Sequence, residues 1–207
     1  MNKKTSQPIE QMGKYRTFEI ADRTVIVDVF IYRRLFKDPD ILPRKKYTFI
    51  RGFHFSGNGP YMFLKAEPNK TVRLSRYIMH AVKGELVDHK NRNYLDNRRC
   101  NLRIATPRQN MLNRIMKNST GFIGVSISKP RNRFYVGTGF RTKEGKRLTF
   151  RCQDTPFNRI LAALARDKFV LLSGEEEFAP LNFPCWQYEP LRGILMEEDL
   201  GKYKEYV

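Results

Sequence analysis

Four polar residues in the middle of the chain have the types needed to hydrolyse a phosphodiester bond. Asp88 and His89 are neighbours, and Asn101 and Asn110 follow them. Hydrolysis needs a base that activates water and a cation that neutralises charge on the phosphate. A histidine titrates near neutrality, so His89 can be the base. Asp88 and Asn110 offer hard oxygen ligands for Mg²⁺ or Mn²⁺, and Asn101 can fix the imidazole tautomer.

Each of these residues also has an ordinary structural interpretation. Asp-His pairs arise by chance, Asn97 and Asn101 suit turns and caps, and Asn110 could be solvated on a helix. His54 and His80 stand outside the group and are expected to be structural. The joint occurrence of the four residues within one short unit favours a site.

The pattern around these residues predicts a strand–loop–strand–helix unit. Strands are expected at 85–90 and 102–105, with a polar loop at 91–99 between them. Neighbours in a regular strand point to opposite faces. Asp88 and His89 therefore share a site only if the strand breaks where the loop begins.

The helix of this unit has a strong start signal. Thr106 can cap it, Pro107 suits its first position, and Gln109 completes a capping box. The helix is expected to run to about Lys117, and a hinge at 118–121 follows. We therefore expect a domain boundary near residue 118.

Further elements are expected on both sides of this unit, in an α+β fold. Before it come strands at 24–29, 45–55, 61–65 and 71–74 and helical stretches at 30–37 and 76–82. After it, period-two alternation predicts antiparallel strands at 125–128, 133–136 and 147–151, and apolar residues at helical spacing predict a helix at 156–173. Residues 1–16 resemble a flexible basic tail, and the structure of 175–207 is left open.

The charge of the chain points to a polyanionic partner. The formal net charge is +18, although residues 174–207 carry three Lys/Arg against eight Asp/Glu. A folded body this basic is typical of nucleic-acid binding. A solvated basic surface rarely reaches this excess, and membrane binding usually brings a basic amphipathic helix or a lipidation motif.

The cysteines and the apolar segments restrict the cellular setting. Cys100, Cys152 and Cys185 are widely separated, which argues against a disulfide framework and a cysteine-pair zinc site. No signal peptide or membrane-spanning run is evident in the sequence. We expect an intracellular, cytoplasmic protein that binds no membrane.

Residues 83–110 resemble the HNH (ββα-metal) motif of phage and intron-encoded homing endonucleases. The resemblance rests on Asp88-His89, Leu95-Asp96-Asn97-Arg98-Arg99, Asn101-Leu102-Arg103 and Ala105-Thr106-Pro107-Arg108-Gln109-Asn110. It implies that His89 activates water, that Asn101 orients His89, and that Asp88 and Asn110 hold one divalent ion. It also implies a 5′-phosphate and a 3′-hydroxyl product. The family commonly has His-Arg where this chain has Ser75-Arg76.

Residues 120–184 resemble the AP2 domain, which binds the major groove of DNA with its sheet. The resemblance rests on Gly121-Phe122-Ile123-Gly124-Val125-Ser126, Arg133-Phe134, Ala165-Arg166-Asp167-Lys168 and Leu181-Asn182-Phe183-Pro184. If Val125, Ile127, Phe134, Val136, Leu148 and Phe150 pack on the helix, polar groups share the opposite face. The expected DNA-binding residues are Ser126, Ser128, Arg131, Arg133, Tyr135, Arg147, Thr149 and Arg151.

These observations predict a metal-dependent, site-selective endonuclease of the homing type. Its expected domains are an N-terminal HNH nuclease at 17–117, an AP2-like domain at 118–184 and an acidic tail at 185–207. Double-stranded DNA is the expected partner, and a monomer or weak dimer with one active site would nick one strand per binding event. Two alternatives stay open: a non-catalytic DNA-binding regulator, and an RNA-binding protein that would leave the Asp88 and His89 group unexplained.

Overall fold

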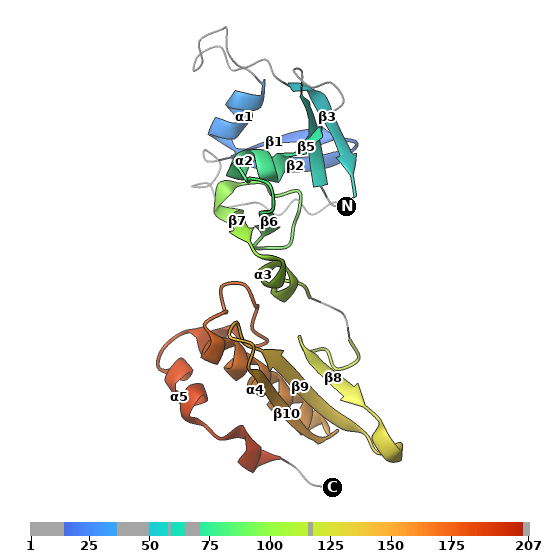
Figure 1. The fold of residues 1–207 in the computed structure, drawn as a ribbon, viewed down its shortest axis with the longest axis vertical. Helices are drawn as coiled ribbons and strands as arrows, with labels where there is room; N and C mark the ends of the chain where they lie inside the picture. The colour runs from blue at the N-terminus through green and yellow to red at the C-terminus, as the bar shows by residue number, and fades with distance from the viewer. Residues whose placement is uncertain (1–14, 37–49, 58, 65–70, 116–117, 205–207) are drawn as a thin grey trace, which may run out of the picture. The chain divides into compact units, whose positions relative to one another are not determined.

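A computed structural model describes residues 15–36, 50–57, 59–64, 71–115 and 118–204, so the expected strand residues 45–49 lie outside the described residues (Figure 1). The chain folds as two compact units, residues 1–110 and 111–207. Both contain helices and antiparallel sheets, which confirms a mixed α+β fold. In the described part of the chain, no helix has the length and apolar character required to span a bilayer.

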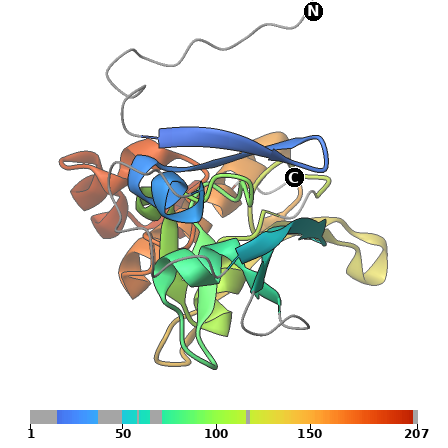
Figure 2. The same ribbon diagram turned by 90° about the horizontal axis from the view of Figure 1, so that it is seen from above.

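The first unit begins with a hairpin of which only the second strand was predicted. Strand β1 (Tyr15–Ile20) pairs antiparallel with β2 (Arg23–Asp28), and α1 (Val29–Phe36) follows directly. Val27 of β2 and Ile31 of α1 are buried in the same apolar core. The hairpin and α1 lie side by side in Figures 1 and 2 because both contribute to this core.

A second sheet and a short helix precede the predicted site in the chain and complete the first unit's core. Strands β3 (Ile50–Ser56), β4 (Gly59–Leu64) and β5 (Thr71–Arg73) form an antiparallel sheet in the order β3-β4-β5. The chain then enters α2 (Leu74–Met79) without a loop. Met62 of β4 is fully buried in the core that also receives the hairpin.

The predicted strand–loop–strand–helix unit is present. Strand β6 (Leu86–His89) pairs antiparallel with β7 (Leu102–Ala105), and a single 3-10 turn, η2 (Arg99–Asn101), precedes β7. Helix α3 (Pro107–Leu112) follows and ends earlier than the expected Lys117. Its last residue, Leu112, packs against a core cluster that contains Phe140 and Val170, whereas Ile115 beyond the helix end is exposed.

The second unit contains the three predicted strands. Strands β8 (Val125–Ser128), β9 (Tyr135–Arg141) and β10 (Arg147–Gln153) form an antiparallel sheet with β9 in the centre. Helix α4 (Pro156–Ser173) covers one face of this sheet, and its bounds match the expected helix (Figure 1). Val125, Val136 and Cys152 from the three strands and Ala162 and Ala163 from α4 form the core between them.

The expectation that Phe134 packs in this core is wrong. Strand β9 begins at Tyr135, so Phe134 lies before the sheet and is 52% exposed. Its ring lies 4.8 Å from the ammonium of Lys129. Cys152, which pairs with Val136 across β9 and β10, takes the core position instead.

The C-terminal residues fold onto α4. They form η4 (Pro184–Gln187), α5 (Leu191–Glu197) and η5 (Leu200–Tyr203). Leu195 and Leu200 are buried in a cluster with residues of α4. The acidic segment therefore contributes to the core of the second unit and closes it.

Candidate functional site

The register of β6 and β7 places the predicted chemical residues at one end of a hairpin. Asp88 lies opposite Arg103, and His89 lies opposite Leu102. His89 is the last residue of β6, so the regular strand ends at the residue where the sequence required a break. Beyond it, the backbone N–H of Lys90 donates to the carbonyl of Asn101 at 2.8 Å and closes the loop.

The capping box that starts α3 is confirmed. The backbone N–H of Gln109 donates to Oγ1 of Thr106 at 3.2 Å, and the backbone N–H of Thr106 donates to Oε1 of Gln109 at 2.8 Å. These two bonds satisfy donors that the helix itself leaves unpaired. They fix where α3 leaves β7 and hence where Asn110 lies along the helix.

Asp88 is a buried carboxylate held by an arginine that the sequence analysis did not single out. Nε and Nη2 of Arg103 donate to Oδ2 of Asp88 at 2.9 and 2.7 Å, and both side chains are buried. A guanidinium compensates the cost of burying a carboxylate. The signal for it was the run Asn101-Leu102-Arg103, because the hairpin register brings Arg103 opposite Asp88.

His89 is half-buried, and its Nε2 lies 3.4 Å from Oδ1 of Asn97. Burial lowers the pKa of His89 below its usual value and outweighs the opposing hydrogen bond of Asn97 and the charges of Asp88 and Asp96. Arg73 adds a smaller effect in the same direction as burial. The ring is therefore neutral at pH 7, as a general base must be.

Asn97 and Asn101 both hold loop backbone, as their interpretation as turn and cap residues predicts, and Asn97 also lies beside the ring of His89. Oδ1 of Asn101 accepts from the backbone N–H of Asn91 at 3.0 Å, and its Nδ2 donates to the carbonyl of Asp96 at 2.8 Å. Asn101 thus holds the backbone of the loop after His89, while Asn97 lies beside the ring. Asn97 had been interpreted as a turn residue, and its full burial is the property that distinguishes it.

A buried ion pair fixes the loop between β6 and β7. Oδ1 and Oδ2 of Asp96 accept from Nε and Nη2 of Arg98 at 2.8 and 2.7 Å, and Nδ2 of Asn91 donates to Oδ2 at 2.9 Å. Burial alone would raise the pKa of Asp96, but the hydrogen bonds and charge of Arg98 outweigh it and lower that pKa. The carboxylate is therefore ionised whenever the loop is folded near neutral pH.

The N-terminal hairpin supports this loop through its backbone. The N–H of Ile26 donates to the carbonyl of Leu95 at 2.9 Å, and the N–H of Asn97 donates to the carbonyl of Ile26 at 2.8 Å. Oδ2 of Asp28 accepts from the N–H of Arg99 at 2.8 Å. Strand β2 thus positions Asn97, and through it the ring of His89.

Arg76 holds the segment that leads into β6. Its Nη2 donates to the carbonyls of Val82 and Ala81 at 2.8 and 3.2 Å, and its Nη1 donates to the carbonyl of Glu85. Ser75, which replaces the family's usual histidine, is buried on α2. The arginine of the expected His-Arg pair therefore has a structural role here that does not depend on its neighbour.

Asn110, the second expected metal ligand, is half-buried in α3, and its side-chain amide makes no hydrogen bond to the rest of the described chain. Among the described residues, no group of three or more His, Cys, Asp and Glu side chains is placed to hold a metal ion. The expected ligand set contains one carboxylate and one amide. Mg²⁺ typically keeps several waters and uses few protein ligands, so the donor chemistry of Asp88 and Asn110 fits such an ion.

The second unit gathers the predicted DNA-binding residues on the sheet face opposite α4. Ser126, Gly137 and Arg151 lie side by side across the three strands, and Ser128 and Tyr135 form part of the next row. Side chains in such rows alternate with the buried rows, so they share the face that α4 leaves open. From the strands, the members of this face expected from the sequence are Ser126, Ser128, Tyr135, Arg147, Thr149 and Arg151.

Two further expected residues border this face from the turn between β8 and β9. Arg131 lies in the turn η3 (Pro130–Asn132) with a positive φ of 49°, and Arg133 follows it. Both side chains are exposed.

Gly137 lies in the centre of the sheet, and the sequence assigned it no function. A Cβ there would lie 2.7 Å from the carbonyl of Phe150, so only glycine permits this approach of β9 and β10.

The hairpin–helix order, with an Asp-His pair at the strand end, defines a ββα unit. Residues 82–112 match a family model described as HNH endonuclease. This short match supports a nuclease that acts on DNA. It lies in the middle of the chain, which corrects the expected placement of the HNH unit at the N-terminus: the two sheets of residues 15–73 precede it. No curated protein and no solved structure matches the chain.

Proposed function

We propose that the chain is a divalent-metal-dependent, site-selective DNA endonuclease of the homing type. The observation that carries the proposal is the Asp88-His89 pair at the end of β6, within the ββα unit that matches the HNH endonuclease model. Its products are a 5′-phosphate and a 3′-hydroxyl. A single such unit in a monomer or weak dimer cleaves one strand per binding event.

In this proposal His89 takes a proton from the attacking water. Its half-buried position favours the neutral ring, and Asn97 limits the rotation of the ring from the Nε2 side. Oδ1 of Asn97 can only accept a hydrogen bond, so Nε2 carries the proton and Nδ1 is the basic nitrogen. Asn101 acts indirectly, by holding the loop backbone that follows His89.

Asp88 and Asn110 would hold one Mg²⁺ or Mn²⁺ ion through their oxygens. When bound, the ion stabilises negative charge on the phosphate and on the leaving oxygen. Arg103 keeps the carboxylate of Asp88 oriented from one side, by donating twice to Oδ2. The second shell of a metal site commonly orients its ligands in this way.

The sheet of the second unit would select the DNA site in the manner of an AP2 domain. Two segments that carry this resemblance are joined in the structure: Oδ1 of Asn182 accepts from the backbone N–H of Ile123 at 2.6 Å. Asn182 in turn donates through Nδ2 to the buried carboxylate of Asp167 at 3.1 Å. These bonds hold the segment before β8 against the segment after α4. The open face of the sheet carries arginines, which suit guanine and phosphate.

A non-catalytic DNA-binding regulator is the second candidate. The observation in its favour is the ion pair of Asp88 with Arg103, because it engages the proposed metal ligand within the protein. Under this alternative the ββα unit would be a structural support, and the sheet face would account for the whole function.

Relaxation of supercoiled plasmid separates the two candidates. We expect the full chain to nick plasmid with Mg²⁺ and to be inactive with a chelator. His89→Ala should lower the rate by about 10²–10⁴-fold, because the general base is lost. Arg99→Ala is the control, because the exposed Arg99 side chain lies in the same loop but outside the site. Tight DNA binding with no nicking would support the regulator. Equal nicking rates for His89→Ala and Arg99→Ala would contradict the role of His89 as the base.

A further inference from the structure

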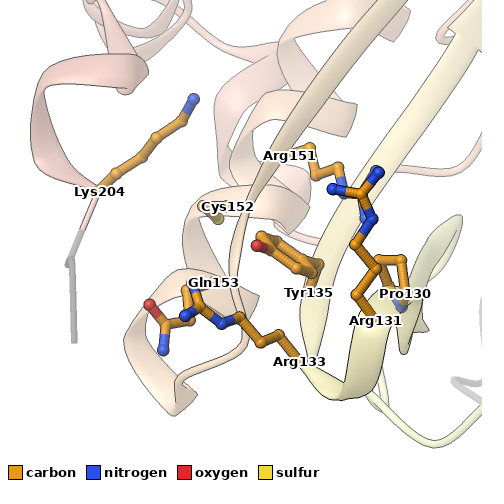
Figure 3. Close-up of a pocket in the computed structure, with 8 residues that line it drawn as sticks. All are labelled: Pro130, Arg131, Arg133, Tyr135, Arg151, Cys152, Gln153 and Lys204. Atoms are coloured by element: carbon orange, nitrogen blue, oxygen red, sulfur yellow. The ribbon is translucent and has the colours of Figure 1, made fainter.

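A pocket of about 940 Å³ opens at one end of the exposed sheet face (Figure 3). The turn η3, the ends of β9 and β10, and the residue after η5 all contribute to it. Figure 3 shows Lys204 on one side of this space and Tyr135 on the other. The ammonium of Lys204 lies 4.6 Å from the ring centroid of Phe150, so Lys204 borders this space from the edge of β10.

The pocket is strongly positive. Its charged lining consists of Arg131, Arg133, Arg151 and Lys204, without an acidic side chain. Within the described residues, Arg131 and Arg133 have no hydrogen bond or ion pair that would compensate their charge. The pocket volume lies in the range of small-ligand sites, and its charge selects a phosphate-bearing ligand.

Among the described residues, an acidic neighbour of this lining along the chain is already neutralised. Asp154, which follows Gln153 along the chain, accepts from Nε and Nη2 of Arg159 at 2.7 and 2.8 Å. The hydrogen bonds from Arg159 lower the pKa of Asp154, so it is ionised and paired. It therefore does not offset the charge of the pocket.

The pocket also contains a stacking surface. The guanidinium of Arg151 lies over the ring of Tyr135, 4.5 Å from its centroid. Unstacked nucleobases bind to aromatic rings and to guanidinium planes. Further along β9, Gly137 and Gly139 present no side chains on this face, so this stretch of β9 is flatter than the pocket at its end.

This difference in shape distinguishes two kinds of DNA contact. A base within a duplex is stacked on both sides and exposes only its edges in the grooves, which a flat face can reach. A concave pocket with a stacking pair suits a base that has left the stack. The cations around it suit the phosphate that accompanies such a base.

We propose that this pocket binds one unpaired nucleotide of DNA, with its base on the Tyr135–Arg151 pair and its phosphate near Arg131 and Arg133. The inference rests on the proposed function of the sheet as a DNA-binding face. It adds a preference for DNA that carries an extrahelical nucleotide.

Fluorescence anisotropy with the full chain in a chelator tests this without cleavage. Three labelled probes are compared at matched salt: a duplex, the same duplex with one bulged nucleotide, and that duplex with an abasic bulge. We expect the bulged duplex to bind about tenfold more tightly than the plain duplex, as one stacked base would give. The abasic bulge, which keeps the phosphate but lacks the base, should bind like the plain duplex.

Variants separate the pocket from the rest of the face. Arg151→Ala and Tyr135→Leu should each remove most of the tenfold gain, and Tyr135→Phe should keep it because the ring is retained. Arg147→Ala is the matched control, since Arg147 is an exposed arginine on the same face of β10 but outside the pocket. It should weaken binding to all three probes by a similar factor.

The outcomes distinguish this inference from the proposed function. Equal binding of the plain and bulged duplexes, or a gain that the abasic bulge retains, overturns the nucleotide pocket alone. A gain that survives in both Arg151→Ala and Tyr135→Leu also overturns it. Failure of all three probes to bind would overturn the DNA-binding role of the chain as well.

Discussion

The ββα unit and the exposed sheet face treat their charged groups in opposite ways. In the ββα unit, Asp88 and Asp96 are buried and each is held by an arginine at 2.7–2.9 Å. On the sheet side, Arg131 and Arg133 are exposed and have no carboxylate partner among the described residues. The buried carboxylates of the ββα unit are compensated within the protein, whereas these exposed arginines leave their charge for a ligand.

This contrast matches what the two proposed tasks require. A catalytic group must be held within a fraction of an ångström, which buried hydrogen bonds from several elements provide. Contacts to DNA phosphates tolerate movement and depend on uncompensated charge. We therefore expect variants of the ββα unit to change stability and rate, and variants of the sheet face to change affinity and site choice.

The largest effect on stability should come from Arg103→Met. It leaves the carboxylate of Asp88 buried without its cation, which typically costs about 3–5 kcal/mol of unfolding free energy. Urea denaturation of the full chain measures this loss. Arg99→Met is the control with the same change in charge, and its exposed side chain should contribute less than about 0.5 kcal/mol. Similar losses for both variants would contradict the role assigned to the buried pair.

A smaller effect, on selectivity, should come from Arg133→Ala and Arg147→Ala. If either arginine contacts a base, its loss should cost about 1–3 kcal/mol of binding to the preferred site. If it contacts phosphate, binding should weaken on all sequences and the salt dependence should become less steep. Sequencing of cleavage ends on a random DNA library measures site choice. Loss of metal-dependent cutting on non-specific DNA would show that the two regions do not divide the work as proposed.

How far the sequence predicted the molecule differs between the two regions. Helix α4 was predicted with its bounds from apolar residues at helical spacing. Its ends also carry local signals: Thr155 accepts a hydrogen bond from the N–H of Asn158, and Gly174 adopts the left-handed conformation. The capping box of α3 was predicted from a local signal of this kind. Such signals lie within a few residues, so a sequence displays them.

Features that depend on distant residues were missed. Leu195 and Leu200 are buried against α4, and this contact gives the C-terminal segment its structure. The residues near them in the sequence do not predict the contact. The pairing of Arg103 with Asp88 depends on the register of a hairpin. Asn97 was overlooked beside His89 because its position is fixed by Ile26 of β2, far away in the sequence.

The pH dependence of cleavage also compares the two regions, because the ββα unit contains a histidine and the exposed sheet face contains none. Burial lowers the pKa of His89, so the ring should stay neutral and basic below the pH at which an ordinary histidine gains a proton. As pH falls, kcat/KM should therefore decline only below about 6.5. A pH–rate profile at constant metal concentration measures this midpoint. A midpoint at or above the ordinary value would show that His89 is not the base, or that it is not shielded from water.

The smallest effect should come from the helix cap, which links the hairpin to Asn110. Thr106→Ala removes the oxygen that accepts from the N–H of Gln109, and loss of such a cap costs about 1 kcal/mol. Thr106→Ser keeps the hydroxyl and should restore most of that stability in urea denaturation. If α3 positions Asn110 for an ion, Thr106→Ala should also raise the Mg²⁺ concentration needed for half-maximal nicking, while plain-duplex affinity in a chelator stays unchanged. An unchanged Mg²⁺ requirement would indicate that α3 does not position Asn110 for the ion, and Asp88 would then be the remaining proposed ligand.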